Sequence, residues 1–342
     1  MRLFLFVLLL VSAESGVAAA GAETHPFCVH DMLVMDRLSD PQVSPDGESV
    51  VFVRRQTDLE ANKGRTDLWL VGADGTNLRR LTSHQAADSN PRWAPDGKSI
   101  WFISARSDSA QIWRIAIDGG EAEQVTDEPL DVGNLLVSRG GEHIAFTMEV
   151  FPDGSTPSET KDRLEKTEKA KATGRVYERI FVRHWDTWKD GRRSHLFVMG
   201  AAGGDPVNVM RDMDADAPSK PFGGPEEITF TPDGKGIIFS ARDVGAEEPW
   251  STDFDLYLAP VDGSRRPRCL TEKNKAWDTS PVFSPDGRIL AYLAMARGGY
   301  ESDRLRIVLR RWPGGAERVL TESWDRSPSS VCFSADGKTA SP

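Results

Sequence analysis

The sequence predicts an all-β protein, and specifically a β-propeller of four-stranded blades. Three observations lead to this fold. A Pro-Asp-Gly turn followed by an apolar run recurs along the chain, as in "SPDGESVVFV" from Ser44 and "APDGKSIWFI" from Ala94. The turns return at a period of roughly 45 to 50 residues. Each period also contains further Gly-rich turns between short apolar runs, which are strong hairpin signals. A period of this length built from hairpins is typical of blades stacked radially.

The repeats can be placed in order along the chain. A weaker copy, "SRGGEHIAFTM", carries Gly140-Gly141 in its turn, and the 93 residues from there to the next turn glycine are one period plus an insertion. We therefore expect five complete blades over about 41–322 and a partial sixth from about 328, with a helical and loop insert in the third blade. The turn aspartates are Asp46, Asp96, Asp233, Asp286 and Asp336.

The repeated phrase has a structural explanation. Proline presets φ for the turn, aspartate accepts a bond from the backbone, and glycine takes the position with positive φ. The apolar runs that follow, "VVFV", "IWFI", "IIF" and "LAYL", are then expected to form interior strands covered on both faces by neighbouring blades. The phrase is predicted to be architecture rather than a catalytic motif.

The insert covers about residues 150–193 and has two parts. The first, "SETKDRLEKTEKAKATG", is highly charged and offers i,i+4 pairs such as Glu165 with Lys169, which favours a surface helix or a partly disordered arm. The second, "RVYERIFVRHWDTWKDGRRSH", mixes aromatic and charged residues and is a candidate binding loop. The alternative is that its aromatic residues only attach the insert to its own blade. The candidate binding residues are Arg183, His184, Trp185, Asp186 and Trp188.

The N-terminus and the charge limit the location and the partners. Residues 1–22, "MRLFLFVLLLVSAESGVAAAGA", have a basic start, a short apolar run and small residues, as in a secretory signal peptide. We expect residues 23–342, an incomplete β-propeller, to be exported to the periplasm or the extracellular space and not to be held in a membrane after cleavage. The net charge of −10 argues against a nucleic-acid partner. The sequence predicts no oligomeric state.

No catalytic or metal-binding motif is found in the sequence. Gly47-Glu48-Ser49 and Gly97-Lys98-Ser99 begin a Gly-x-Ser-x-Gly pattern but do not complete it. No two histidines have the spacing of a zinc pair, so we expect no catalytic residue, no metal and no cofactor. The pairs Glu226-Glu227 and Glu247-Glu248 could bind an amino terminus, but adjacent acids are also common on exposed loops.

Several segments resemble exported serine peptidases of the prolyl oligopeptidase family, of the dipeptidyl-peptidase and acylaminoacyl-peptidase type. These segments are "MLVMDRLSDPQVSPDGESVVFV", "RRLTSHQAADSNPRWAPDGKSIWFIS", "RVYERIFVRHWDTWKDGRRSHLFVM" and "AYLAMARGGYESDRLRIVL". The resemblance implies a propeller that covers the active site of an α/β-hydrolase domain and admits short peptides. In the longer parent protein we expect this loop to face the hydrolase domain, with Trp185, Asp186 and Trp188 lining the substrate chamber.

Two functions remain open at this point. The first is the propeller portion of a secreted serine peptidase, truncated before its catalytic domain and therefore inactive alone, because no catalytic triad residue can be assigned here. The second is a stand-alone periplasmic propeller of the Tol type that binds a protein or peptide without catalysis. The last repeat, "VCFSADGKTASP", stops where its siblings continue into a strand, which favours the first.

Overall fold

The computed structural model describes residues 25–154, 156–178, 180, 182–184 and 186–341. The chain forms two compact units, one up to Met35 and one from Asp36 onward. The expected signal peptide, residues 1–22, lies outside the described residues. Across the described part of the chain, no helix is long and apolar enough to cross a bilayer.

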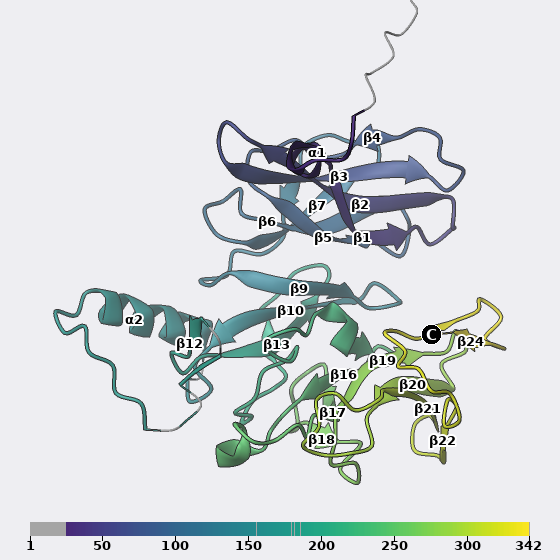
Figure 1. Ribbon diagram of the computed structural model, residues 1–342. Helices are drawn as coiled ribbons and strands as arrows, with labels where there is room; N and C mark the ends of the chain where they lie inside the picture. Colours follow the sequence, from purple (N-terminus) through teal and green to yellow (C-terminus); the bar gives the residue numbers. More distant parts are fainter. Residues whose placement is uncertain (1–24, 155, 179, 181, 185, 342) are drawn as a thin grey trace, which may run out of the picture. The chain divides into compact units, whose positions relative to one another are not determined.

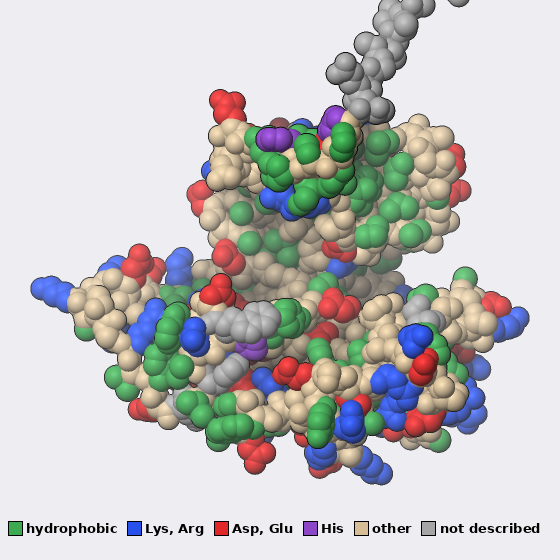
Figure 2. Space-filling model, viewed as in Figure 1, with side chains coloured by type: hydrophobic (Ala, Val, Ile, Leu, Met, Phe, Trp, Pro, Cys, Tyr) green, Lys and Arg blue, Asp and Glu red, His purple; other side chains and the backbone are tan. Residues whose placement is uncertain are grey.

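The first unit contains one short helix, α1 (Val29–Val34). The helix begins after Cys28, whose backbone N–H donates to the Asp31 carboxylate over 2.7 Å. Its apolar side chains are largely exposed, and Figure 2 shows hydrophobic side chains and histidines gathered over α1. This segment therefore contributes no buried core of its own.

The second unit consists of antiparallel sheets in chain order (Figure 1). Five of these sheets have four strands, and a two-stranded sheet follows them, as the sequence predicts. The strands of the first two sheets are β1 (Arg37–Val43), β2 (Ser49–Asp58), β3 (Lys63–Gly72), β4 (Arg79–Arg80), β5 (Asp88–Trp93), β6 (Ser99–Ser104), β7 (Gln111–Ala116) and β8 (Glu123–Gln124). Those of the third are β9 (Val132–Val137), β10 (His143–Val150), β13 (Arg193–Gly200) and β14 (Val207–Asn208).

The remaining sheets continue the same pattern. Their strands are β15 (Ile228–Phe230), β16 (Gly236–Ala241), β17 (Asp255–Pro260), β18 (Arg268–Cys269), β19 (Asp278–Phe283), β20 (Ile289–Ala294), β21 (Arg306–Arg311), β22 (Glu317–Val319), β23 (Cys332–Phe333) and β24 (Ala340–Ser341). Two short 3₁₀ turns, Pro225–Glu227 and Gly245–Glu247, interrupt the connections. The four-stranded sheets thus run from Arg37 to Val319, which begins slightly earlier than the predicted 41–322.

The core lies between consecutive sheets. In β6, Ile100 and Phe102 pack toward the first sheet, while Trp101 and Ile103 pack toward the third. Side chains alternate between the two faces of a strand, so a strand between two sheets must be apolar on both faces. This confirms the predicted interior strands for sheets with a neighbour on each side. The first sheet differs, because Phe52 in β2 points away from that core and is only half-buried.

The recurring turn has a second role that the sequence alone does not show. A Cβ added to Gly287 would lie 2.7 Å from the Cβ of Pro232, the proline of the preceding sheet's turn. A Cβ on Gly141 would likewise approach Pro95 to 2.9 Å. Each proline therefore packs against the turn glycine of the next sheet. Glycine is required in these turns both for its positive φ and for this close approach.

Replacing Gly287 with alanine should destabilise the second unit more than replacing Gly47. Both glycines have positive φ, 71° and 77°, but the space around Gly47 is open. We expect a loss of about 1 kcal/mol for G47A from backbone strain and about 2–3 kcal/mol for G287A, where the clash adds to the strain. Urea unfolding measures both. Equal losses would show that the proline contact contributes nothing.

The first strands of the sheets carry β-bulges that link neighbouring sheets. Asp40 and Asn90 have positive φ at the bulges of β1 and β5. The Arg92 guanidinium donates to Asp40 over 2.8 Å, and the Asn90 side-chain oxygen accepts from the Leu135 N–H over 2.5 Å. Each bond joins one sheet to the next. Sequence reasoning missed these bulges, although the triplets "SDP" and "SNP" mark them.

Candidate functional site

The connections of the second unit divide into two sets at opposite ends of the strands. The Pro-Asp-Gly turns, such as the one between β19 and β20, lie at one end. Because adjacent strands are antiparallel, the next connection in each sheet lies at the other end. We call that end the loop face; its connections include residues 151–192, 209–227, 242–254, 295–305 and 320–331.

The insert in the third sheet lies on the loop face and begins with helix α2 (Pro157–Glu168). Thr156 caps the helix by accepting from the Glu159 N–H, and Thr160, the buried residue of the helix, accepts from the Phe151 N–H over 3.1 Å. The expected pair of Glu165 with Lys169 is present at 3.0 Å. The predicted helix is thus confirmed, and it is attached to the end of β10.

A two-residue hairpin follows, formed by β11 (Arg183–His184) and β12 (Thr187–Trp188). Arg183 is exposed and lies over the Trp188 ring at 5.7 Å, and the Tyr177 ring is tilted against the same ring, with the two ring centroids 6.1 Å apart. His184 is half-buried and Asp186 is exposed. Trp185 lies outside the described residues. The structure therefore brings Arg183 and Trp188 together on an exposed hairpin and tests no role for the five predicted residues.

The hairpin is fixed to the next sheet by a half-buried ionic network. Lys189, directly after β12, contacts Glu248 of the fourth sheet's loop at 2.7 Å. Arg193 donates to both oxygens of Glu248, at 2.8 and 2.7 Å, and to Asp214 and Asp216. Burial opposes the charge of Arg193, but the bonds to Glu248 and the charge of Asp216 raise its pKa above the ordinary value.

The same network explains the second adjacent pair of acids. Burial would raise the pKa of Glu248, but the bonds from Arg193 and Lys189 lower it to about 2. In the first pair, Glu227 is buried and accepts from the Ser219 N–H, the Ser219 hydroxyl and the Thr279 hydroxyl; burial raises its pKa. One member of each pair is thus held by internal bonds, and neither pair is simply exposed.

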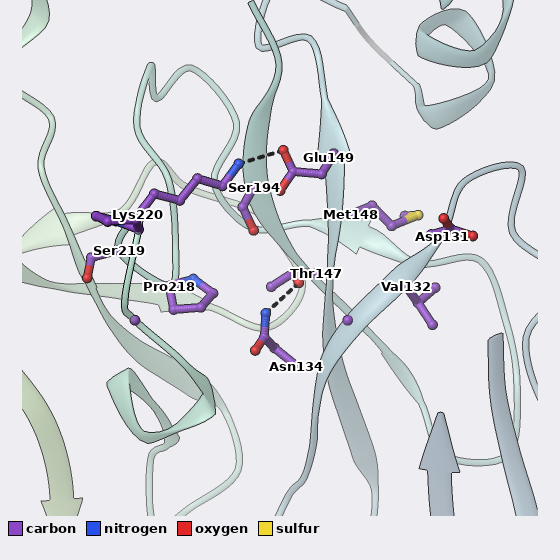
Figure 3. A pocket seen from close by; sticks show the side chains of 13 residues that line it. Asp131, Val132, Asn134, Thr147, Met148, Glu149, Ser194, Pro218, Ser219 and Lys220 are labelled. Carbon is purple, nitrogen blue, oxygen red and sulfur yellow. Dashed lines mark hydrogen bonds and ion pairs between the residues drawn. The ribbon is translucent and has the colours of Figure 1, made fainter. Parts of the chain in front are cut away.

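A cavity of about 340 Å³ opens between β9, β10, β13 and the connection at 218–223 (Figure 3). Lys220 bridges Glu149 at 2.7 Å and Asp216 at 3.2 Å at its edge, and Asn134 donates to Thr147 over 3.0 Å. Its volume is at the lower end of that of ligand sites. The cavity lies at the loop-face end of its strands, and the four predicted residues that the structure describes, Arg183, His184, Asp186 and Trp188, do not line it.

The buried histidine of β13 has a structural role. His195 is buried, and its two ring nitrogens lie within hydrogen-bond distance of the Met213 carbonyl and the Asn208 amide. Burial lowers its pKa to about 4, so it is neutral at ordinary pH. The neighbouring Ser194 donates to the Ala217 carbonyl and faces the opposite side of the strand. These two residues therefore do not form a nucleophile and its base.

Exposed aromatic side chains gather on the loop face. Among the described residues from Asp36 onward, six aromatic side chains are strongly exposed, with exposed fractions from 37% to 71%, and all six belong to loop-face connections. They are Tyr177, Trp188, Phe222, Trp250, Tyr300 and Trp324. The strongly exposed aromatic side chains of the described second unit therefore all lie at the end of the sheets opposite the Pro-Asp-Gly turns.

Comparison with known proteins identifies relatives by sequence. Residues 34–153 match the family model described as the TolB beta propeller domain. Dipeptidyl-peptidase 5 of Porphyromonas endodontalis is 33% identical over 283 residues, which are 81% of this chain and 40% of the relative. Dipeptidyl-peptidase 5 of Porphyromonas gingivalis is 28% identical over 96% of this chain and 48% of the relative. The chain thus spans less than half the length of these relatives.

A solved structure supports the same fold. Acylaminoacyl peptidase of Pyrococcus horikoshii superposes with a TM-score of 0.61 at 17% identity, over 88% of this chain and 41% of the other. At 17% identity, the structural similarity supports the fold alone. The relationship to dipeptidyl-peptidase 5 rests on the sequence comparisons. Over most of its length, this chain is therefore a β-propeller related to part of dipeptidyl-peptidase 5.

Proposed function

We propose that this chain is the propeller portion of an exported serine peptidase that acts on short peptides. In this proposal the loop face covers the active site of an α/β-hydrolase domain and limits the substrates that reach it. The kinship with dipeptidyl-peptidase 5 supports the reaction class. The signal-like residues 1–22 support export to the periplasm or the extracellular space.

The observation that carries the proposal is the placement of the exposed aromatic side chains. All six lie on the loop face, whereas no aromatic side chain at the Pro-Asp-Gly end is strongly exposed among the described residues from Asp36 onward. A second domain or a bound peptide on the loop face would remove these rings from water. An aromatic side chain contributes most to the free energy of binding where the partner buries its ring.

The hairpin β11–β12 is the part of the loop face proposed to contact substrate. Trp188 is exposed, and Arg183 lies over its ring, so an aromatic surface and a positive charge are presented together. Lys189 and Arg193 hold the base of the hairpin against Glu248. Trp185, His184 and Asp186 complete the proposed set.

The test compares this chain with the longer protein encoded by its extended reading frame. We expect the longer protein to cleave dipeptidyl or acyl-peptide chromogenic substrates and residues 23–342 alone to cleave neither. In the longer protein, the double variant W185A/W188A should raise KM by about tenfold or more, because stacking contacts of this kind are worth about 1–2 kcal/mol. L78A, an exposed apolar residue in the turn between β3 and β4, is the control and should leave KM unchanged.

Two results would count against the proposal. Turnover by residues 23–342 alone, above a mock purification, would place the catalytic residues within this chain. Unchanged KM and kcat in W185A/W188A would show that the hairpin has a packing role and does not contact substrate. Equal effects of W185A/W188A and L78A would indicate a general loss of stability instead.

A further inference from the structure

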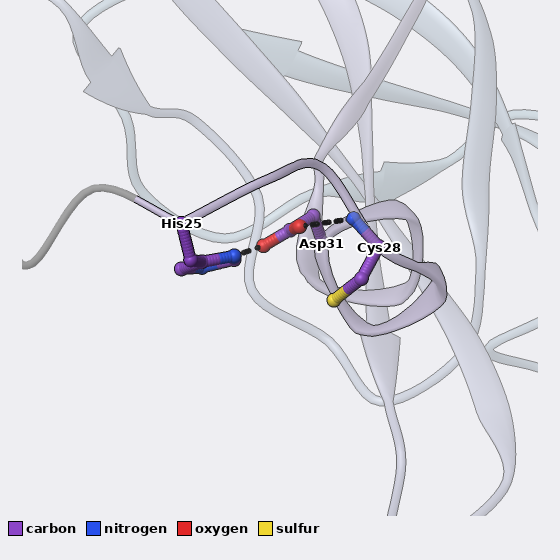
Figure 4. Close-up of side chains that lie close together, drawn as sticks. All are labelled: His25, Cys28 and Asp31. Carbon is purple, nitrogen blue, oxygen red and sulfur yellow. Dashed lines mark hydrogen bonds and ion pairs between the residues drawn. The ribbon is translucent and has the colours of Figure 1, made fainter.

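We propose that His25, Cys28 and Asp31 form a binding site for a zinc ion. The three side chains lie at the start of α1 in the first unit, and one ligand atom from each falls within 4.8 Å of the other two (Figure 4). The His25 Nε2 and an Asp31 carboxylate oxygen are 3.5 Å apart. Ligand atoms of a tetrahedral zinc ion, bound at about 2.0–2.3 Å, are separated by about 3.3–3.8 Å. The separations of the three ligand atoms are therefore close to those in a zinc site, and small side-chain movements would complete the coordination geometry.

Hydrogen bonds in this segment orient two of the three ligands. The Cys28 N–H donates to one oxygen of Asp31 over 2.7 Å, which directs the other oxygen toward His25. The His25 Nδ1 lies 2.9 Å from the Pro26 carbonyl, which accepts only from a protonated nitrogen. The neutral ring then presents the lone pair of Nε2 toward Asp31. Bonds of this kind fix the tautomer and the direction of metal ligands.

The chemistry of the three ligands selects the metal. A thiolate and an imidazole favour zinc over magnesium or calcium, which prefer oxygen ligands. Three protein ligands leave one tetrahedral position for water or another donor. A His–Asp contact on the surface would by itself be a weak ion pair, and the thiol is what turns it into a metal site. Binding would displace the thiol proton of Cys28, so affinity should rise with pH.

Sequence reasoning missed this group because it compared the spacing of histidines with one another. The pattern His-x-x-Cys-x-x-Asp places one potential ligand every three residues. Around a tight turn followed by a helix, residues three apart lie on the same side. The sequence therefore did contain a metal-binding pattern, but its three ligands are of different residue types.

The test uses residues 23–342 with cobalt and zinc. We expect one equivalent of Co²⁺ to give a thiolate-to-cobalt charge-transfer band, and Zn²⁺ to displace it. C28S should abolish the band, and H25A and D31N should each weaken zinc binding by at least about tenfold in competition with a chromophoric chelator, since loss of outer-shell partners alone costs that much. C332S, the other exposed cysteine, and H30A, a histidine of the same helix, are matched controls that should keep the band.

Three outcomes would overturn the proposal. The band could persist in C28S and vanish in C332S, which would place the thiolate elsewhere. Zinc could bind with several weak equivalents that H25A does not change, which is adventitious binding. No cobalt band at one equivalent in the reduced protein would also reject the site. Because the three residues lie at the surface, the variants should unfold at the same temperature as the parent chain, and this is measured in parallel.

Discussion

Replacing Arg193 with methionine should lower the free energy of unfolding by about 3–5 kcal/mol, the typical cost of removing one partner from a buried ionic group. Arg193 is nearly buried and contacts Glu248, Asp214 and Asp216. Its loss leaves these carboxylates close together, and among the described residues Lys189 and Arg242 are then the cations paired with Glu248. Methionine keeps most of the side-chain volume. The loss of stability therefore comes from removing the charge rather than from creating a cavity.

The neighbouring Arg192 provides a matched control. It pairs with Asp190 at 2.8 Å, and both side chains are about one-third exposed. R192M should therefore change stability by no more than about 1 kcal/mol. Urea unfolding followed by fluorescence gives both values. An R193M protein as stable as R192M would show that the network contributes little to the fold.

Acid pH tests the same network from the carboxylate side. The folded pKa of Glu248, about 2, lies below its unfolded value of 4.5. The stability that Glu248 contributes is therefore fully present above about pH 4.5 and is lost as pH falls toward 2. E248Q should remove this dependence, whereas E247Q, at an exposed position, should retain it. Release of Lys189 in E248Q should also make the β11–β12 hairpin more sensitive to limited proteolysis.

Raising the pH from 5 to 8 should lower the free energy of unfolding, because the buried carboxyl group of Asp278 loses its proton on unfolding; this is the second large expected effect. Asp278 is fully buried at the start of β19, and one of its oxygens accepts from Asn274 over 2.8 Å. Its other oxygen has no hydrogen-bond partner among the described residues. Burial raises its pKa to about 8, above the unfolded value of 3.8. In the equivalent residue of the second sheet, Asp88, both oxygens instead accept from one guanidinium nitrogen of Arg106.

The direction of this effect follows from the two pKa values. Between pH 3.8 and 8 the unfolded chain binds fewer protons at this site than the folded chain, so stability falls as pH rises. We expect D278N to reduce the stability difference between pH 5 and pH 8 by about 2–4 kcal/mol, for a pKa change of this size.

Asp286 is the control for this experiment. It is exposed, and the hydroxyl of Ser284 and the Arg288 N–H lower its pKa, so it stays ionised over this range. D286N should leave the slope of stability against pH unchanged. If D278N and the parent chain lose stability in parallel between pH 5 and 8, Asp278 does not titrate there.

The sequence by itself determined the fold of the second unit, because local turn motifs and a periodic repeat of apolar runs specify that fold. The turn of residues 44–48 needs only its own proline, aspartate and glycine, and the alternation in "IWFI" follows from the two faces of one strand. The insert and its helix were also visible, since a charged stretch at helical spacing depends on neighbours three and four residues away.

Only the tertiary structure decided which side chains meet across the sheets. The approach of Pro232 to Gly287, and the pairing of Arg193 with Glu248 across 55 residues, depend on how consecutive sheets pack. Such contacts leave no periodic trace in a single sequence, because each partner is consistent with many environments. The same reason explains why Glu248 resembled an exposed acid in the sequence and is a nearly buried partner of Arg193 in the fold. The gathering of aromatic side chains on the loop face is likewise a property of the packed sheets, because their positions in the chain are far apart.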